Sequence, residues 1–174
     1  MQITDVRVRK VEKGGKMKAV VSIMGKTTDD YTAEKKGGGT RFPHLTWDLV
    51  KEMADSGAVE VQNHSYNLHG SHGAKRLRGE DAEVYKKRLR KDLEKMQRRT
   101  KEQIGYAPTA FTYPLGAFSG ESGEVLRELG ISASFSCTEG INILYHGKPD
   151  CLFMLKRNIR TQNRSAADII TGLK

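Results

Sequence analysis

The sequence predicts an α/β protein with a mostly parallel sheet, either open or closed into a barrel. Short apolar runs rich in β-branched residues alternate with segments whose apolar residues recur at helical spacing. The length of 174 residues suits one domain, and 37% hydrophobic residues are enough for a buried core. The five strands that can be recognised are too few for a complete eight-stranded barrel.

The first two predicted strands flank a loop and a short helix. Residues 17–25 are mostly apolar and close on a glycine, which is typical of a buried strand. The segment that follows, through the glycine run ending at Thr40, is predicted to be a loop. Thr46 is a suitable N-cap for an amphipathic helix over residues 47–56, and alternation over residues 58–62 predicts the next strand.

The second half of the chain continues the alternation. Residues 80–105 carry apolar residues at helical spacing among charges, with no Gly or Pro before Gly105, and this predicts a long surface helix. The remaining predicted elements are strands at 108–114, 131–137 and 151–157, a helix at 121–129, and a last helix that Ser165 caps and that runs to residue 170.

Positive charge dominates the chain. Thirty Lys and Arg residues against 21 Asp and Glu give a formal charge of +9, which suits an anionic partner such as nucleic acid, a cell-wall polymer or a lipid surface. Much of this charge lies in residues 75–101, where acidic residues are interleaved as on a solvated helix face. Aromatic residues for base stacking are scarce there, so we expect no nucleic-acid partner.

The two cysteines and the apolar runs carry little information on compartment. Cys137 and Cys151 lack CxxC spacing, so we expect free thiols, with one bridge between them as the alternative. No apolar run approaches the roughly 20 residues of a membrane span, and residues 1–5 lack the apolar region of a signal peptide. These features fit a cytoplasmic protein or a chain without its targeting segment.

Residues 59–72 contain three of the five histidines, His64, His69 and His72. His64 follows the strand predicted at 58–62, and α/β sheets carry ligand sites beyond the carboxyl ends of their strands. A spacing of five residues places two side chains about 140° apart on a helix and on opposite faces of a strand. His64 and His69 can therefore share one ion only if the chain turns between them.

Turn-forming residues between and after these histidines make such a geometry accessible. Asn67 and Gly70 supply turn chemistry, and a loop after a strand is the usual place for a site. A polar loop whose histidines only form hydrogen bonds is the alternative. His72, His44 or a nearby carboxylate could complete a set of metal ligands with His64 and His69.

Residues 63–69, Asn-His-Ser-Tyr-Asn-Leu-His, resemble the second motif of the polysaccharide deacetylases, the NodB-homology group also called carbohydrate esterase family 4. Other segments resemble the same family in the right order. Residues 18–25 resemble its second strand, and residues 111–118, with Tyr-Pro-Leu-Gly, resemble its third motif. Residues 126–142 continue the resemblance, which covers roughly residues 17–157 and implies an incomplete (β/α) barrel.

The resemblance implies a hydrolase that removes N-acetyl groups from a carbohydrate polymer such as peptidoglycan or chitin-like N-acetylglucosamine chains. Its members hold a divalent metal, often zinc, with one Asp and two His, to which His64 and His69 correspond. The ion polarises the amide carbonyl and its bound water, and an Asp acts as general base. Tyr113 matches the position near the oxyanion, and Tyr113, Pro114 and Gly116 match the substrate-binding loop. Members are usually extracellular or associated with the cell wall.

The chain departs from the family pattern at its start. The family's Thr-Phe-Asp-Asp motif, which carries the base and the Asp ligand, has no counterpart in residues 1–16, where Asp5 is the first acid. Asp29 and Asp30 follow two threonines but lie after the strand that the motif should precede, so we expect them to be loop residues. We therefore expect an atypical segment at 1–16, followed by a partial deacetylase domain at 17–174 that lacks its first strand.

Two consequences follow for function. A missing first strand leaves a sheet edge exposed, which favours association with a second copy. The general base and acid are unassigned, because the third-motif Arg and the final catalytic His also have no counterpart, and His146 is expected to lie in a solvated loop. The alternatives to an enzyme are a non-catalytic carbohydrate- or metal-binding module and, less favoured, a basic nucleic-acid-binding domain.

Overall fold

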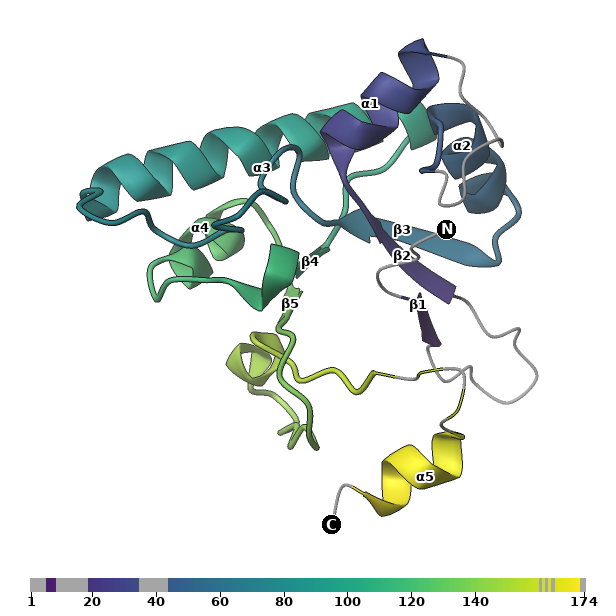
Figure 1. Ribbon diagram of the computed structural model, residues 1–174, viewed down its shortest axis with the longest axis vertical. Helices are drawn as coiled ribbons and strands as arrows, with labels where there is room; N and C mark the ends of the chain where they lie inside the picture. Colours follow the sequence, from purple (N-terminus) through teal and green to yellow (C-terminus); the bar gives the residue numbers. More distant parts are fainter. Residues whose placement is uncertain are drawn as a thin grey trace.

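The computed structural model describes residues 6–8, 19–34, 44–159, 161, 163 and 165–172. Helices and strands alternate along the chain (Figure 1), which confirms the predicted α/β class. In chain order the elements are β1 (Val6–Val8), β2 (Ala19–Ile23), α1 (Gly25–Ala33), α2 (Trp47–Asp55), β3 (Val59–Asn63), α3 (Ala82–Ile104), β4 (Ala110–Thr112), the 3-10 turn η1 (Pro114–Gly116), α4 (Ser122–Glu128), β5 (Ala133–Phe135), the 3-10 turn η2 (Pro149–Leu152) and α5 (Ala166–Thr171).

The five described strands form one open, strongly curved sheet in the order β1-β2-β3-β4-β5. Strands β2 to β5 are parallel to one another. The hydroxyl groups of Ser22 on β2 and Thr112 on β4 approach to 2.9 Å although β3 lies between these strands. Side chains two strands apart meet in this way only on the inner face of a curved sheet, so the architecture is that of an incomplete barrel.

The sequence predicts an exposed edge beside β2, but in the structure a strand pairs with β2 on that side. β1 pairs with β2 in antiparallel register, with Val6 opposite Val21 and Val8 opposite Ala19. The described chain therefore has no parallel strand before β2, but the edge of β2 is paired over these residues. Among the described strands, β1 and β5 end the sheet order, and Asp5 lies outside the described residues.

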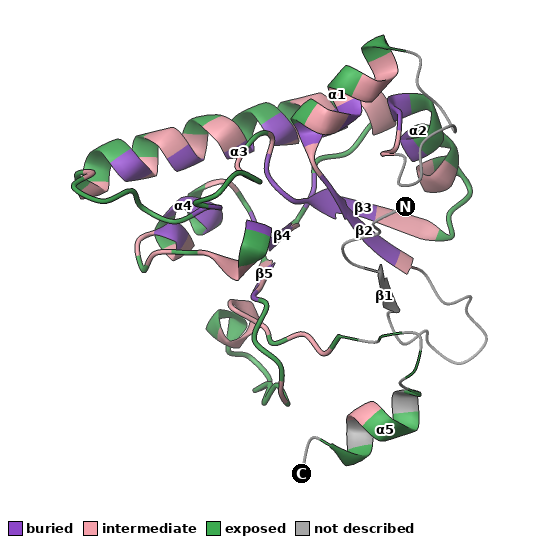
Figure 2. Cartoon of the chain, in the orientation of Figure 1, coloured by how far each residue is buried: buried purple, intermediate pink, exposed green. Residues whose placement is uncertain are grey.

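The long helix α3 organises the core, as its sequence pattern predicts. Asp81 caps it by accepting the N–H groups of Glu83 and Val84, and Gly105, with φ of 85°, ends it. Buried positions recur along one side of α3 and concentrate in β2 and β3 (Figure 2). The helix contributes to both apolar clusters through its fully buried side chains Tyr85, Leu89, Leu93 and Met96.

The prediction of a loop after β2 is wrong over the residues of helix α1. Its sequence, Gly-Lys-Thr-Thr-Asp-Asp-Tyr-Thr-Ala, contains poor helix formers, and the local pattern gives no helical signal. Tertiary hydrogen bonds stabilise it instead: the Trp47 N–H donates to the Thr32 hydroxyl at 2.9 Å, and the Trp47 indole donates to Asp29 at 2.6 Å. Gly25 lets the helix start against Tyr66, because a Cβ there would lie 2.6 Å from its ring.

The prediction of a strand at residues 151–157 is also wrong. The chain forms η2 there, and only Leu155 makes an isolated parallel bridge, with Phe135. The predicted elements that the structure confirms are β2, α2, β3, α3, β4, α4, β5 and α5, each within a few residues of its expected bounds. Cys137 and Cys151 are free thiols. None of the helices in the described ranges has both the length and the apolar content needed to cross a bilayer.

Candidate metal-binding site

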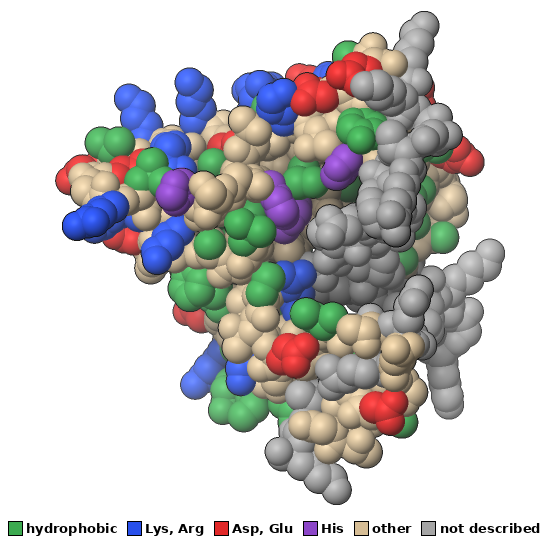
Figure 3. Space-filling model, in the orientation of Figure 1, with side chains coloured by type: hydrophobic (Ala, Val, Ile, Leu, Met, Phe, Trp, Pro, Cys, Tyr) green, Lys and Arg blue, Asp and Glu red, His purple; other side chains and the backbone are tan. Residues whose placement is uncertain are grey.

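The histidine loop, residues 64–69, lies at the carboxyl end of β3, where the sequence predicts a site. The His64 N–H still donates to Ile23 O on β2, at 3.1 Å, and the chain then leaves the sheet. Helix α1 meets the loop: the N–H groups of Gly25 and Lys26 donate to the carbonyls of Ser65 and Tyr66 at 3.1 and 2.8 Å. Figure 3 shows histidine side chains on the face of the molecule that it draws.

His64 is held in one tautomer. Its side chain is 3% exposed, and Nδ1 lies 2.7 Å from Thr112 O on β4. A carbonyl oxygen only accepts, so Nδ1 carries the proton and Nε2 keeps its lone pair. Burial lowers the pKa of His64 to about 4, more than the hydrogen bond to Thr112 raises it. The imidazole is therefore neutral near pH 7, in the state that binds a metal ion.

His69 stands next to His64 because the chain turns between them. Ser65 adopts a left-handed conformation with φ of 72°, and its hydroxyl accepts the Leu68 N–H at 3.0 Å. The two imidazole ring centroids are 5.0 Å apart, with their planes at 61°. An ion stands about 2 Å from each ligating nitrogen, so rings at this separation can share one ion.

Of the predicted ligands, the described residues bring His64 and His69 together. No group of three or more His, Cys, Asp or Glu side chains within the described ranges is placed to hold an ion. His44 packs edge-on against Tyr31, with ring centroids 5.0 Å apart, and His72 and His146 are exposed loop residues. The histidine pair thus fits a metal ion, but a third protein ligand is not among the described residues.

Asp29 and Asp30 lie on α1 and face other partners. Asp29 accepts hydrogen bonds from Trp47 Nε1, Tyr66 Oη and Arg99 Nε at 2.6, 2.9 and 2.8 Å. Burial acts to raise the pKa of Asp29, but these donors outweigh it and the pKa is lowered overall. Asp30 is exposed and pairs with Lys26 at 2.7 Å. The expectation that both are loop residues is wrong, and Asp29 is a structural carboxylate.

The loop after β4 packs tightly against the end of β5. Tyr113 is 1% exposed, with its phenol 2.7 Å from the Ser122 hydroxyl and its N–H bonded to Phe135 O. Pro114 is buried, and Gly116 has φ of 66° with Cys137 Cβ only 2.7 Å from where its own Cβ would stand. The phenol of Tyr113 therefore faces the core, and the roles of this loop in substrate and oxyanion binding stay predictions.

Three contributors to the site carry no recognisable signal in the sequence. Thr112 fixes the His64 tautomer through its carbonyl, which any residue type could do. Arg157 lies near enough for its charge to help lower the pKa of His64, and it donates to Cys137 Sγ at 2.9 Å. Asp92, on α3, accepts two N–H groups of the histidine loop, although 25 residues separate it from Asn67.

Comparisons with known proteins give a family match over most of the chain and a match to a different kind of protein over a short stretch. A family model described as polysaccharide deacetylase matches residues 4–134. The poly-β-1,6-N-acetyl-D-glucosamine N-deacetylase of Escherichia coli K12 is 29% identical over 113 residues, which cover 55% of this chain and 17% of that protein. A stretch of 30 residues, 17% of the chain, is 77% identical to the putative septation protein SpoVG of Agathobacter rectalis, of which it covers 31%.

A solved structure shares the fold. The de-N-acetylase from Aggregatibacter actinomycetemcomitans superposes with a TM-score of 0.66 at 22% sequence identity, over 88% of this chain and 64% of that one. The chain thus spans less than two thirds of that structure and a smaller share of the E. coli protein. On the match over residues 4–134, the chain belongs to the polysaccharide deacetylase family.

Proposed function

We propose that this chain is a carbohydrate N-deacetylase domain that binds a divalent metal ion such as zinc through His64 and His69. The observation that carries the proposal is the buried, neutral His64, whose Nδ1 is engaged with Thr112 O and whose Nε2 is left for an ion beside His69. The E. coli relative acts, by its name, on a polymer of N-acetylglucosamine, and this supports such a polymer, peptidoglycan or a chitin-like chain, as substrate.

The residues of this chain have defined parts in that proposal. A bound divalent ion supplies Lewis acidity toward an amide carbonyl and lowers the pKa of bound water. His64 and His69 hold the ion, and Thr112 keeps Nε2 of His64 unprotonated. We assign no general base, because Asp29 already accepts three hydrogen bonds and Asp30 is paired with Lys26.

A non-catalytic metal- or carbohydrate-binding module is the second candidate. The observation that favours it is the two-histidine set, which among the described residues has no third His, Cys, Asp or Glu ligand. Such a module would bind the ion and the glycan without releasing acetate.

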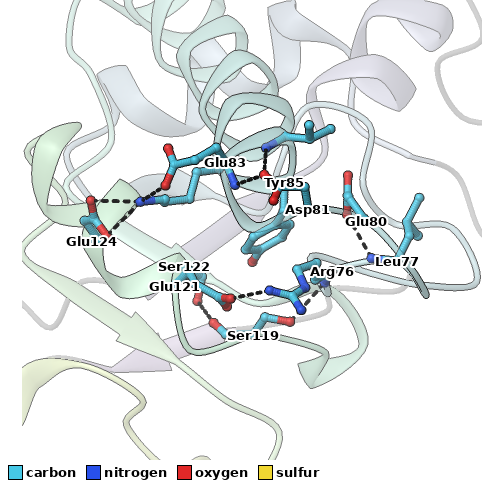
Figure 4. A network of polar contacts seen from close by, with 12 residues as sticks. Arg76, Leu77, Glu80, Asp81, Glu83, Tyr85, Ser119, Glu121, Ser122 and Glu124 are labelled. Carbon is cyan, nitrogen blue, oxygen red and sulfur yellow. Dashed lines mark hydrogen bonds and ion pairs between the residues drawn. The ribbon is translucent and has the colours of Figure 1, made fainter.

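Ion pairs made by basic residues on α3 and just before it disfavour the third candidate, a nucleic-acid-binding domain. Figure 4 shows Arg76 paired with Glu121, and a lysine of α3 held between Glu83 and Glu124. Arg88 and Arg90 are likewise paired, with Glu80 and Glu128. Side chains neutralised by neighbouring carboxylates contribute little to a phosphate-binding surface, so this face is better described as a solvated helix surface.

Acetate release distinguishes the first two candidates. Purified wild type, His64→Ala and the control His72→Ala are loaded with Zn²⁺ and incubated with N-acetylglucosamine oligomers and with peptidoglycan fragments. A deacetylase releases acetate in the wild type and in His72→Ala but not in His64→Ala. Glycan binding without acetate release in any sample contradicts the enzyme and supports the binding module.

A further inference from the structure

One carboxylate of α3 holds the middle of the histidine loop. Asp92 Oδ1 accepts the Tyr66 N–H at 2.7 Å, and Asp92 Oδ2 accepts the Asn67 N–H at 2.8 Å. These two amides lie between His64 and His69 in the sequence. Both oxygens of one carboxylate thus bind consecutive backbone donors in the turn that brings the imidazoles together, and such charge-assisted bonds are short and directional.

Two further residues on the same side of α3 fix the Tyr66 side chain, one directly and one through Asp29. Lys95 Nζ stands 3.8 Å from the centroid of the Tyr66 ring. The Tyr66 hydroxyl donates to Asp29, which Arg99 binds in turn at 2.8 Å. Asp92, Lys95 and Arg99 are spaced three and four residues apart, which places them on one face of the helix.

The loop is therefore held from two sides. Helix α1 donates to the carbonyls of Ser65 and Tyr66, and Asp92 accepts the N–H groups of Tyr66 and Asn67. The Ser65 and Leu68 N–H groups have acceptors close by in the chain, Asn63 Oδ1 and Ser65 Oγ, whereas among the described residues Asp92 is the acceptor of the Tyr66 and Asn67 amides. The position of His69 relative to His64 depends on this turn.

We propose that Asp92 is a positioning residue that preorganises the two histidines for one metal ion before the ion arrives. The part of this inference that concerns metal affinity rests on the proposed function of His64 and His69. The part that concerns loop order rests on the Asp92 contacts alone.

The test compares Asp92→Asn with Asp81→Asn. Asp81 also accepts two backbone N–H groups at α3, those of Glu83 and Val84, but does not contact the histidine loop, so it controls for general loss of helix stability. Hydrogen exchange of the metal-free protein is followed for the Tyr66 and Asn67 amides. We expect about tenfold faster exchange there in Asp92→Asn, and wild-type exchange in Asp81→Asn.

Zn²⁺ titration of the same proteins supplies the second readout. We expect about tenfold weaker binding in Asp92→Asn and unchanged binding in Asp81→Asn. Wild-type exchange at Tyr66 and Asn67 in Asp92→Asn, or equal acceleration in both variants, overturns the positioning role. A wild type that binds no Zn²⁺ overturns the metal site instead, and the exchange result still decides whether Asp92 orders the loop.

Discussion

Replacing Asp29 by Asn tests the structural role that the fold assigns to the first acid of the Thr-Thr-Asp-Asp sequence. Asp29 is 22% exposed and joins α1, α2, the histidine loop and α3 through Trp47, Tyr66 and Arg99. An Asn side chain keeps the oxygen that accepts the Trp47 and Arg99 donors, and its amide group can donate to the Tyr66 hydroxyl, but it removes the negative charge that pairs with Arg99. Hydrogen bonds to a charged group contribute about 1.5–3 kcal/mol each and do not add fully. We expect Asp29→Asn to lower the free energy of unfolding by about 1–3 kcal/mol, because the hydrogen bonds lose their charge assistance.

Urea unfolding at pH 7 measures this loss, and Asp30→Asn is the matched control. Asp30 is 52% exposed and takes part in one i,i+4 pair with Lys26, so its replacement should change the free energy of unfolding by at most about 0.5 kcal/mol. Equal unfolding midpoints for Asp29→Asn and wild type would refute the assignment of Asp29 as a structural carboxylate.

The difference between wild type and Asp29→Asn should also depend on pH. The pKa of Asp29 is lowered in the folded protein, so the unfolded chain takes up the proton first as the pH falls. The stabilisation is complete above the unfolded pKa near 4 and is lost as the pH falls through the folded value. The gap between the two proteins is therefore expected to be smaller at pH 3 than at pH 7, and a gap independent of pH would contradict this account.

Two further substitutions test the packing around the site. Gly116→Ala places a Cβ at 2.7 Å from Cys137 Cβ in a left-handed conformation and should cost about 2–4 kcal/mol in urea unfolding, whereas Gly120→Ala, with no atom within 4 Å, should cost nearly nothing. Leu93→Ala removes a fully buried side chain of α3 and should cost about 2–5 kcal/mol, whereas Val84→Ala, 58% exposed, should stay within about 0.5 kcal/mol. Equal free energies of urea unfolding within either pair would contradict the burial described here.

The sequence predicts the elements that local signals specify. Helix α3 follows from its apolar spacing and from Gly105 after its last turn, and α2 follows from the Thr46 cap. Helix α1 could not be predicted, because its stability comes from Trp47 and other partners distant in the sequence. The 151–157 segment has an apolar run but pairs with the sheet only at Leu155, so periodicity alone misassigned it.

The site shows the same division between local and distant information. The spacing of His64 and His69 required a turn between them, and the structure has that turn at Ser65. The sequence could not show which groups hold the turn, because Asp92 belongs to a helix that begins more than ten residues later and reads as one charge among many. The third metal ligand stays unassigned for a different reason, since the family's acidic motif has no counterpart before β2.

Zinc binding by the histidine pair tests the central proposal most directly. Calorimetric titration of the chelator-treated protein with Zn²⁺ should show one site in the wild type and in His72→Ala, whose side chain is exposed. Binding should be lost in His64→Ala and in His69→Ala, because the remaining imidazole cannot hold the ion alone. Equal Zn²⁺ binding in the wild type and in both of these variants would contradict the account.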